Sequence, residues 1–325
     1  MLQLPKLSSS ILDELKKGKN LLAFSAGSDS SALFFILKAL HIEFDIAIVD
    51  YQTRKQSAEE KEYAQALSKK FNKRCYTLTC SLKHNNFEHN ARATRYKFFE
   101  QIIKKHSYST LLTAHNLNDK LEWFLMQLSK GAGTVELSGM SEIEQGEDYK
   151  TIRPLLYTDK NEILNFLHVN KIEYFLDSSN TNSKYFRNKI RKEFANSFCE
   201  QFSSGIKKSF EYLEKDKLRL LPKEIERHKK LYILQRDKDD LINIRGVDRV
   251  VKKLGVLLSS GMRDEIVKTK DCIVSKKVAI AFSEDRIYIC PAVDVVMDKR
   301  FKERCRVKKI PSKIRPYIYK ENIPI

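Results

Sequence analysis

Residues 21–31 have the sequence LLAFSAGSDSS, and this stretch decides the fold. A hydrophobic run over residues 21–25 leads into a turn of small residues, and helical spacing of apolar residues follows over residues 30–40. A turn of this kind presents backbone N–H groups and hydroxyls at a helix start, which suits a phosphate. The stretch lacks the G-x-x-x-x-G-K-[ST] pattern, so we do not expect a Walker-type site. The composition of this stretch is equally compatible with a turn that has only a structural role.

Strand-like and helix-like segments alternate outward from this stretch. Apolar runs suited to buried strands occupy residues 21–25, 44–50, 74–79 and 110–114. Helical periodicity lies between and after them, at residues 30–40, 57–71, 91–105, 118–129 and 160–170. Continuous apolar strands that alternate with helices are typical of a parallel sheet covered on both sides. We therefore predict an α/β fold with a parallel sheet and helices on both faces.

The C-terminal part has a different pattern. Residues 202–230 are charged and helical in period, whereas residues 276–291 predict two strands around a Ser-Glu-Asp turn. We therefore expect a catalytic domain over residues 1–200 and a smaller mixed, mainly helical domain over residues 201–325.

Charge and composition point to a polyanionic partner. The chain has a formal charge of +18, and residues 201–325 carry 31 Lys and Arg against 18 Asp and Glu. Neutralisation of phosphate groups supplies most of the affinity of proteins for nucleic acids. Binding to a membrane surface, or solubility alone, would also explain a high positive charge. No apolar stretch approaches the roughly 20 residues that span a bilayer, no signal peptide is evident, and the six cysteines form no C-x-x-C pair. We expect a cytoplasmic protein with reduced thiols and no membrane partner.

Residues 25–30 resemble the S-G-G-x-D-S pyrophosphate loop of the N-type ATP pyrophosphatases, the PP-loop family. The resemblance implies that ATP is cleaved between its α and β phosphates. The residues that would hold ATP are Ser25, Ala26, Gly27, Ser28, Asp29 and Ser30. Ala26 stands where the family has its first glycine, and alanine suits that position only if the backbone needs neither a positive φ nor a very close approach.

Residues 113–122, TAHNLNDKLE, resemble the A-H-H-x-x-D-Q-x-E signature of the lysidine synthetases, from which Asn116 and Lys120 depart. Asp119 and Glu122 are three residues apart and would share one face of a helix. Two such acids could hold Mg²⁺, or bind an ammonium and accept its proton; a solvated helix face is the alternative. The resemblance implies catalytic roles for Asp29, Asp119 and Glu122, a Mg²⁺ site at Asp29 and Asp119, and substrate contact by His115.

Residues 91–96, ARATRY, are similar to the A-R-x-x-R-Y helix of the same family. Guanidinium groups on one helix face suit a phosphate or a carboxylate, while surface ion pairs would use them equally well. The resemblance implies that Arg92 and Arg95 bind substrate and that Arg92 also takes part in catalysis. Arg54 follows the second strand, where the family also has an arginine, and is expected to contact ATP.

Three later elements occur in the family's order. Residues 153–155 (RPL), 177–180 (DSSN) and 185–191 (YFRNKIR) resemble its R-P-L, D-x-[ST]-N and Y-x-R-N-x-I-R elements. Cations beside aromatic rings suit a phosphate backbone and an unstacked base, although a basic helix end would explain each arginine in isolation. The resemblance implies lysine or tRNA contacts by Asp177, Asn180, Arg187, Asn188 and Arg191.

Together these elements, within residues 20–195, imply a ligase that uses ATP and Mg²⁺. Such an enzyme adenylates the wobble cytidine of tRNA(Ile) with a CAU anticodon and then joins free L-lysine to C2, releasing pyrophosphate and AMP. The basic region over residues 201–325 is expected to bind the tRNA. The oligomeric state stays open, with a homodimer among the options.

Three alternatives remain from the sequence. A tRNA thiolase of the same fold would need a cysteine pair or cluster near the loop, and only Cys75 and Cys80 come close in the chain. A catalytically silent tRNA-binding protein would have no use for acids facing an anion. A GMP-synthetase-like amidotransferase would need a glutaminase portion, which is not visible.

Overall fold

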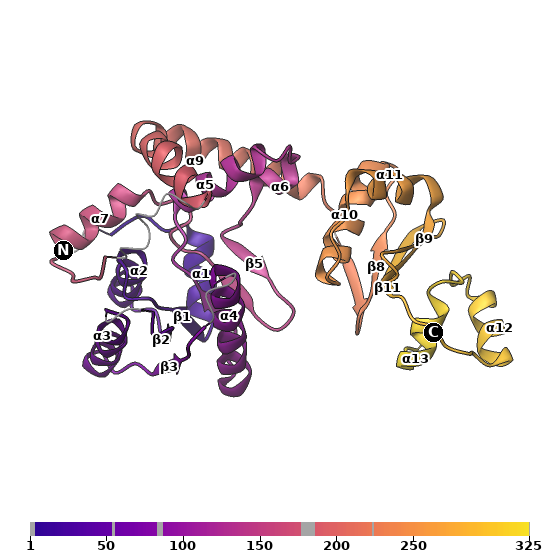
Figure 1. The fold of residues 1–325 in the computed structure, drawn as a ribbon, viewed down its shortest axis with the longest axis horizontal. Coiled ribbons are helices and arrows are strands. Elements are labelled where there is room, and N and C mark those ends of the chain that lie inside the picture. The colour runs from indigo at the N-terminus through magenta and orange to yellow at the C-terminus, as the bar shows by residue number, and fades with distance from the viewer. Residues whose placement is uncertain (1–3, 54–55, 83–86, 177–185, 223, 325) are drawn as a thin grey trace. The chain divides into compact units, whose positions relative to one another are not determined.

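The computed structural model describes residues 4–53, 56–82, 87–176, 186–222 and 224–324. The chain divides into two compact units, residues 1–214 and 215–325 (Figure 1). The division falls inside helix α9 (Asn196–Arg219) and thus later than the expected boundary at residue 200. The reason is that α9 continues through residue 200 and buries Ile206 and Phe210 in the core of the first unit.

A six-stranded sheet forms the centre of the first unit, with strand order β3-β2-β1-β4-β6-β5. Every neighbouring pair is parallel except β5 and β6, which confirms the predicted parallel sheet. Leu22 of the central strand lies opposite Ile46 and Leu112 of its two neighbours. The strands are β1 (Asn20–Ala23), β2 (Phe44–Asp50), β3 (Cys75–Thr79), β4 (Thr110–Leu112), β5 (Ile143–Gln145) and β6 (Lys150–Ile152).

Helices cover both faces of this sheet, as predicted, because successive strand side chains point to opposite sides. Leu22 packs in a core shared with α1 (Ser9–Lys17), α2 (Ser28–Ala39), α3 (Gln56–Lys70) and α7 (Lys160–Val169). Its neighbour Leu21 packs instead with Phe98 and Phe99 of α4 (Phe87–His106) (Figure 1). Strand β1, which leads into the loop, is thus packed on both of its faces.

A third core fixes the helices beside the sheet's carboxyl edge. Leu117 and Leu121 of α5 (Leu117–Leu128) pack against Ala195 and Cys199. This contact ties α5 to the π-helical turn η2 (Arg191–Ala195), which continues directly from α8 (Phe186–Ile190). The short helix α6 (Thr134–Ser138) follows α5.

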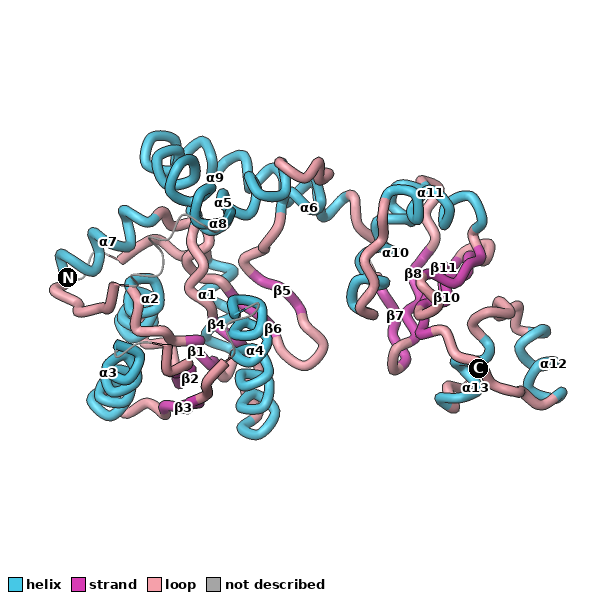
Figure 2. The backbone as a smooth tube through the Cα atoms, viewed as in Figure 1, coloured by secondary structure: helices cyan, strands magenta, loops and turns pink. Residues whose placement is uncertain are grey.

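The second unit contains both helices and strands, as predicted (Figure 2). It is built on a five-stranded antiparallel sheet of order β7-β8-β11-β10-β9. One face packs against α10 (Asp240–Lys253) and α11 (Ser260–Thr269), the other against α12 (Lys299–Val307) and α13 (Arg315–Glu321). The predicted hairpin is confirmed as two of its strands. The strands are β7 (Ile225–His228), β8 (Leu231–Gln235), β9 (Asp271–Val274), β10 (Val278–Phe282) and β11 (Arg286–Pro291).

The helix predicted over residues 202–230 is wrong beyond Arg219, where α9 ends. Pro222 cannot continue a helix and disfavours helical geometry in the residue before it. Its ring lies so close to Gly246 that a Cβ there would collide with Cγ of the proline. The charged stretch that follows enters the sheet as β7. Among the described residues, no helix is long and apolar enough to cross a membrane.

Candidate active site

The pyrophosphate loop joins β1 to α2, and its serine hydroxyls are connected. Ser30 Oγ accepts a hydrogen bond from the N–H of Ser25 at 3.2 Å, lies 3.1 Å from Ser25 Oγ, and donates to the carbonyl of Gly27 at 3.2 Å. Gly27 caps α2 without a side chain, so no cap side chain occupies the first N–H groups of the helix. This geometry leaves a helix N-terminus and hydroxyls for an anion.

Ala26 has a φ of 57° and is fully buried. Its carbonyl accepts hydrogen bonds from the N–H of Phe175 at 2.9 Å and from Ser31 Oγ at 3.3 Å. The expectation was that alanine suits this position only if the backbone needs no positive φ. The structure shows that the backbone does adopt a positive φ here, so this condition is not met. The left-handed conformation costs a non-glycine residue roughly 1–2 kcal/mol, and these surrounding bonds hold the residue there.

A cavity of about 680 Å³ opens in front of the loop. It brings together residues from the loop, from α4, from the β4–α5 connection, from the start of α7 and from η2. The predicted site residues that line it are Ser25, Gly27, Ser28, Asp29, Ser30, Arg92, Arg95, His115, Asp119 and Arg191. The sequence elements that lie far apart in the chain thus meet at one place.

Asn116, which departs from the signature, links the two acids of the cavity. It forms a capping box at the start of α5: its Oδ1 accepts from the N–H of Asp119 at 3.1 Å, and its own N–H donates to Asp119 Oδ2 at 3.1 Å. Its Nδ2 donates to Asp29 Oδ1 at 3.2 Å. Sequence reasoning missed this role, although an Asn followed three residues later by an acid is a recognisable helix-start signal.

Glu122 lies behind Asp119 and does not line the cavity. Its side chain is 2% exposed and accepts hydrogen bonds from Nε of Arg187 and, at 2.6 Å, from Nε of Arg191. Arg191 Nη2 also donates to Asp119 Oδ1 at 2.7 Å. Burial opposes charge on Arg191, but Asp119 and Glu122 outweigh it and raise the pKa of that guanidinium.

Lys160 is a cavity residue that sequence reasoning missed. It is the first residue of α7, whose N-cap is Asp159, and its Nζ donates to Asp29 Oδ1 at 2.6 Å and to Ser28 Oγ at 2.7 Å. Burial raises the pKa of Asp29, with Asp119 adding to the rise and Lys160 opposing it. The sequence did contain one signal for this residue, because it is a lysine that directly follows a Thr-Asp helix start.

Arg92 and Arg95 reach the cavity from α4. Arg92 Nη2 donates to the hydroxyl of Tyr96 at 3.3 Å, and its guanidinium lies 4.7 Å from the centre of that ring. Neither arginine forms an ion pair with any residue in the described ranges. Both are therefore open to an anionic substrate.

His115 enters the cavity beside Asp119, and its Nδ1 lies 2.9 Å from Thr113 Oγ1. Burial lowers the pKa of the imidazole to about 4; Asp119 opposes the change, and Arg153, Arg92 and Arg187 add to it. The ring is therefore neutral at pH 7.

The remaining predicted residues fall elsewhere. Arg54, Asp177 and Asn180 lie outside the described residues. Asn188 is on α8 and, like Arg187, does not line the cavity. Within the described ranges, no group of three or more His, Cys, Asp or Glu side chains is arranged to hold a metal.

Lys120, the second departure from the signature, turns away from the cavity. Its side chain is 1% exposed, and Nζ donates to the carbonyls of Ser138, at 2.9 Å, and Met140. This lysine therefore anchors α5 to the segment after α6. Cys75 and Cys80 also lie outside the cavity lining, and burial raises the pKa of both thiols.

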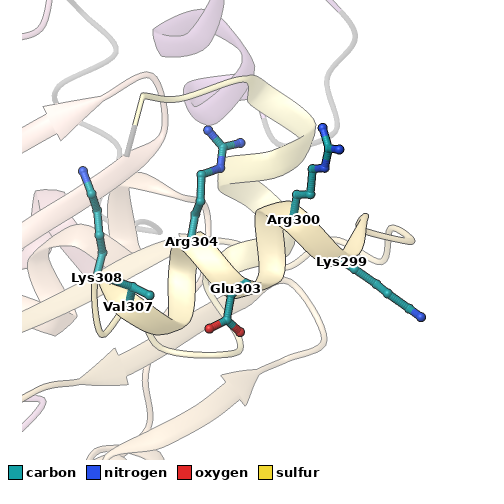
Figure 3. A pocket seen from close by; sticks show the side chains of 6 residues that line it. All are labelled: Lys299, Arg300, Glu303, Arg304, Val307 and Lys308. Carbon is teal, nitrogen blue, oxygen red and sulfur yellow. The ribbon is translucent and has the colours of Figure 1, made fainter.

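The second unit carries a row of exposed cations along α12 and its C-cap residue. Phe301 and Cys305 bury one face of this helix. Arg300, Arg304 and Lys308 follow one another at intervals of four residues, and Figure 3 shows them extending from the same side of the helix. Such a row suits a phosphate backbone.

Similarity to known proteins extends over nearly the whole chain. Residues 3–198 match the family model for the PP-loop domain. The chain is 43% identical to the tRNA(Ile)-lysidine synthase of Campylobacter jejuni (strain RM1221), covering 98% of both chains. It is 41% identical to the tRNA(Ile)-lysidine synthase of Wolinella succinogenes, covering 96% of both, and 41% identical to that of Helicobacter pylori (strain 26695), covering 95% of this chain and 92% of the relative.

Among solved structures, the U34-tRNA thiolase NcsA of Methanococcus maripaludis is similar, with a TM-score of 0.51. The match covers 64% of this chain and 75% of the thiolase at 15% identity, so it supports the fold alone. The lysidine synthases, by contrast, match along nearly the whole chain. This chain therefore belongs to the tRNA(Ile)-lysidine synthase family.

Proposed function

We propose that this chain joins lysine to C2 of the wobble cytidine in a tRNA(Ile) with a CAU anticodon, converting ATP to AMP and pyrophosphate. The observation that carries the proposal is the link between Asp29 of the pyrophosphate loop and Asp119 of α5 through Asn116. One cavity thereby holds a site for the phosphates of ATP and a carboxylate suited to an amine.

In the first step, the C2 oxygen of cytidine attacks the α-phosphorus, and pyrophosphate leaves. The hydroxyls of Ser25, Ser28 and Ser30 and the N-terminus of α2 would hold the pyrophosphate end. Arg92 and Arg95 would bind the α-phosphate or the carboxylate of lysine. Such groups act by position and charge, which is how most phosphoryl-transfer sites work.

Mg²⁺ fits the acids of the cavity. Both hydrogen bonds to Asp29 from described residues go to Oδ1, so Oδ2 accepts none from them. Burial and then the charge of Asp119 raise the pKa of Asp29, and a cation would relieve this destabilisation of the carboxylate. Asp29 and Asp119 would hold the ion, and its chemistry there would be to neutralise the departing pyrophosphate.

In the second step, the ε-amine of lysine adds at C2 and AMP leaves. The amine must be neutral to attack, and Asp119 is the acid on the cavity wall that can first bind the ammonium and then accept its proton. Glu122 would act indirectly, because it orients Arg191, which in turn contacts Asp119. The residues proposed to contact the tRNA are Asp177, Asn180, Arg187 and Asn188.

The basic second unit would bind the tRNA backbone, with the α12 row of Arg300, Arg304 and Lys308 contributing. A thiolase reaction is less well supported, because neither Cys75 nor Cys80 lines the cavity and both thiols have raised pKa values.

The test is incubation of the protein with ATP, Mg²⁺, radiolabelled lysine and unmodified tRNA(Ile) with a CAU anticodon. We expect label in the tRNA, recovered as a modified cytidine after nuclease digestion. The matched control is the same tRNA with a GAU anticodon, which has no wobble cytidine. If the folded protein binds the tRNA and consumes ATP but transfers no label, the lysine assignment fails.

A further inference from the structure

We propose that Lys160 is the cation that binds the pyrophosphate portion of ATP and stabilises it as it leaves. This inference rests on the proposed function and deepens it by assigning a phosphate-binding residue outside the pyrophosphate loop. Lys160 belongs to α7, more than a hundred residues after the loop in the chain. Its ammonium nevertheless lies against the loop, 2.7 Å from Ser28 Oγ and 2.6 Å from Asp29 Oδ1.

The loop itself supplies no cation. Residues 25–31 contain only Ser, Ala, Gly and Asp, whereas a Walker-type loop carries its own lysine. ATP and its leaving pyrophosphate are strongly anionic, and Asp29 adds a further negative charge at this point. A positive group from another element is therefore needed beside the loop.

Four cations line the cavity among the described residues: Arg92, Arg95, Lys160 and Arg191. Of these four, Lys160 is the one that forms hydrogen bonds with the loop. Arg191 is held by Asp119 and Glu122 at 2.7 and 2.6 Å. Arg92 contacts Tyr96 on its own helix. These three would serve the α-phosphate and lysine side of the cavity.

The Lys160–Asp29 ion pair is exchangeable. Both side chains are about one-third exposed, at 31% and 32%, and lysine is a flexible point charge that can rotate between acceptors. Ser28, the other partner of Lys160, is the first residue of α2, at the helix end where an anion binds. An anion at the helix end would therefore sit within reach of the ammonium.

The step balances without a proton from Lys160. A bond forms between the C2 oxygen and the α-phosphorus, the bond from the α-phosphorus to the bridging oxygen breaks, and its electron pair leaves with pyrophosphate. The negative charge that grows on pyrophosphate is then stabilised by the ammonium, which remains protonated.

The test compares Lys160→Met with Lys207→Met in the full chain. Lys207 is a matched control because it also contacts the start of α7, through Glu162 Oε1 at 2.5 Å, has a similar side-chain exposure of 27%, and does not line the cavity. Isothermal titration with inorganic pyrophosphate should show affinity lower by about 10- to 100-fold for Lys160→Met, the usual size of a charge-assisted contact. Lys207→Met should stay within about twofold of wild type.

Two further variants make the result specific. Lys160→Arg should recover part of the affinity, since it keeps the charge. The double variant Lys160→Met/Asp29→Asn, titrated without added metal, should stay weak. Recovery of wild-type affinity in the double variant would overturn the proposal, because Lys160 would then only neutralise Asp29. Equal affinities in the two single methionine variants would overturn it as well.

A kinetic readout separates this inference from the proposed function. Single-turnover release of pyrophosphate with tRNA should slow in Lys160→Met by a larger factor than the KM for lysine changes. Wild-type protein that releases pyrophosphate but transfers no lysine would remove the proposed function and leave this inference standing. Wild-type protein that binds neither pyrophosphate nor ATP would remove this inference.

Discussion

Asp119 and Glu122 lie one helical turn apart on α5, yet only Asp119 lines the cavity. The Asp119 side chain is 15% exposed and the Glu122 side chain 2%. Arg191 joins them, donating to Glu122 at 2.6 Å and to Asp119 at 2.7 Å. The two acids therefore differ in position: Asp119 faces the cavity, and Glu122 holds the arginine behind it.

The first prediction tests the role of Asp119 by kinetics. Asp119→Asn should slow single-turnover lysine transfer by about 10²- to 10⁴-fold, the usual contribution of a general base. Pyrophosphate release should slow as well, because Asp119 is also a proposed Mg²⁺ ligand. Asparagine can still accept the hydrogen bond from the N–H of Asn116, so α5 keeps its cap. Full lysine transfer by a folded Asp119→Asn variant would exclude Asp119 as the base.

The second prediction concerns the stability of the arginine cluster. Arg191→Gln removes a partner from the buried Glu122 carboxylate, and breaking such pairs typically costs 3–5 kcal/mol. Because Arg191 is 27% exposed and Arg187 remains, we expect the free energy of unfolding in urea to fall by roughly 2–3 kcal/mol. Lys192→Gln, at the next and exposed position, should change it by less than about 0.5 kcal/mol. Equal effects would show that the cluster adds no stability.

The third prediction follows from the depressed pKa of His115. Burial lowers that pKa to about 4, below the value near 6.5 in the unfolded chain. The unfolded state therefore binds the proton more readily, so this group's contribution to stability is fully present above about pH 6.5 and is lost as pH falls toward 4. NMR titration of the imidazole should give a midpoint near 4. Unfolding of His115→Gln should depend less on pH over this window; an ordinary midpoint near 6.5 would contradict the prediction.

The fourth prediction concerns the left-handed conformation of Ala26. Ala26→Gly relieves roughly 1–2 kcal/mol of backbone strain but adds unfolded-state entropy and loses a buried methyl group, so the net change should stay within about 1 kcal/mol. Ala26→Val should lower the free energy of unfolding by more than about 2 kcal/mol, because a branched side chain tolerates positive φ poorly and the site is fully buried. Similar stabilities of the two variants would show that the loop can readjust.

The fifth prediction concerns the cationic row on α12. Replacing Arg300, Arg304 and Lys308 by Gln should weaken tRNA binding and reduce the slope of log affinity against log salt by about 2–3, nearly one per lost phosphate contact. The control is Lys16→Gln/Lys17→Gln on α1, two exposed lysines that should leave the slope nearly unchanged. An unaltered slope in the α12 variant would show that its charge only solvates the surface.

The sequence by itself determined the architecture of the first unit. Apolar runs and helical periods are local properties, so the order of strands and helices from residue 21 to residue 129 could be predicted and is confirmed. The end of α9 at Arg219 was missed because charged residues occur both on a helix surface and on an exposed strand. Pro222 was the local signal that the helix could not continue.

The sequence also determined most of the residues that meet in the cavity, through short elements such as SAGSDS and AHNLND. Only the tertiary structure decided which of the charged side chains face the cavity and which partner each of them contacts. Lys160 reaches the loop because α7 packs beside α2, and no spacing in the chain encodes that contact. Likewise, Glu122 is withdrawn from the cavity because α8 and η2 pack on α5 and bring Arg187 and Arg191 onto it. Contacts between elements distant in sequence depend on packing of the whole core, and it is this packing that assigns each charge its partner.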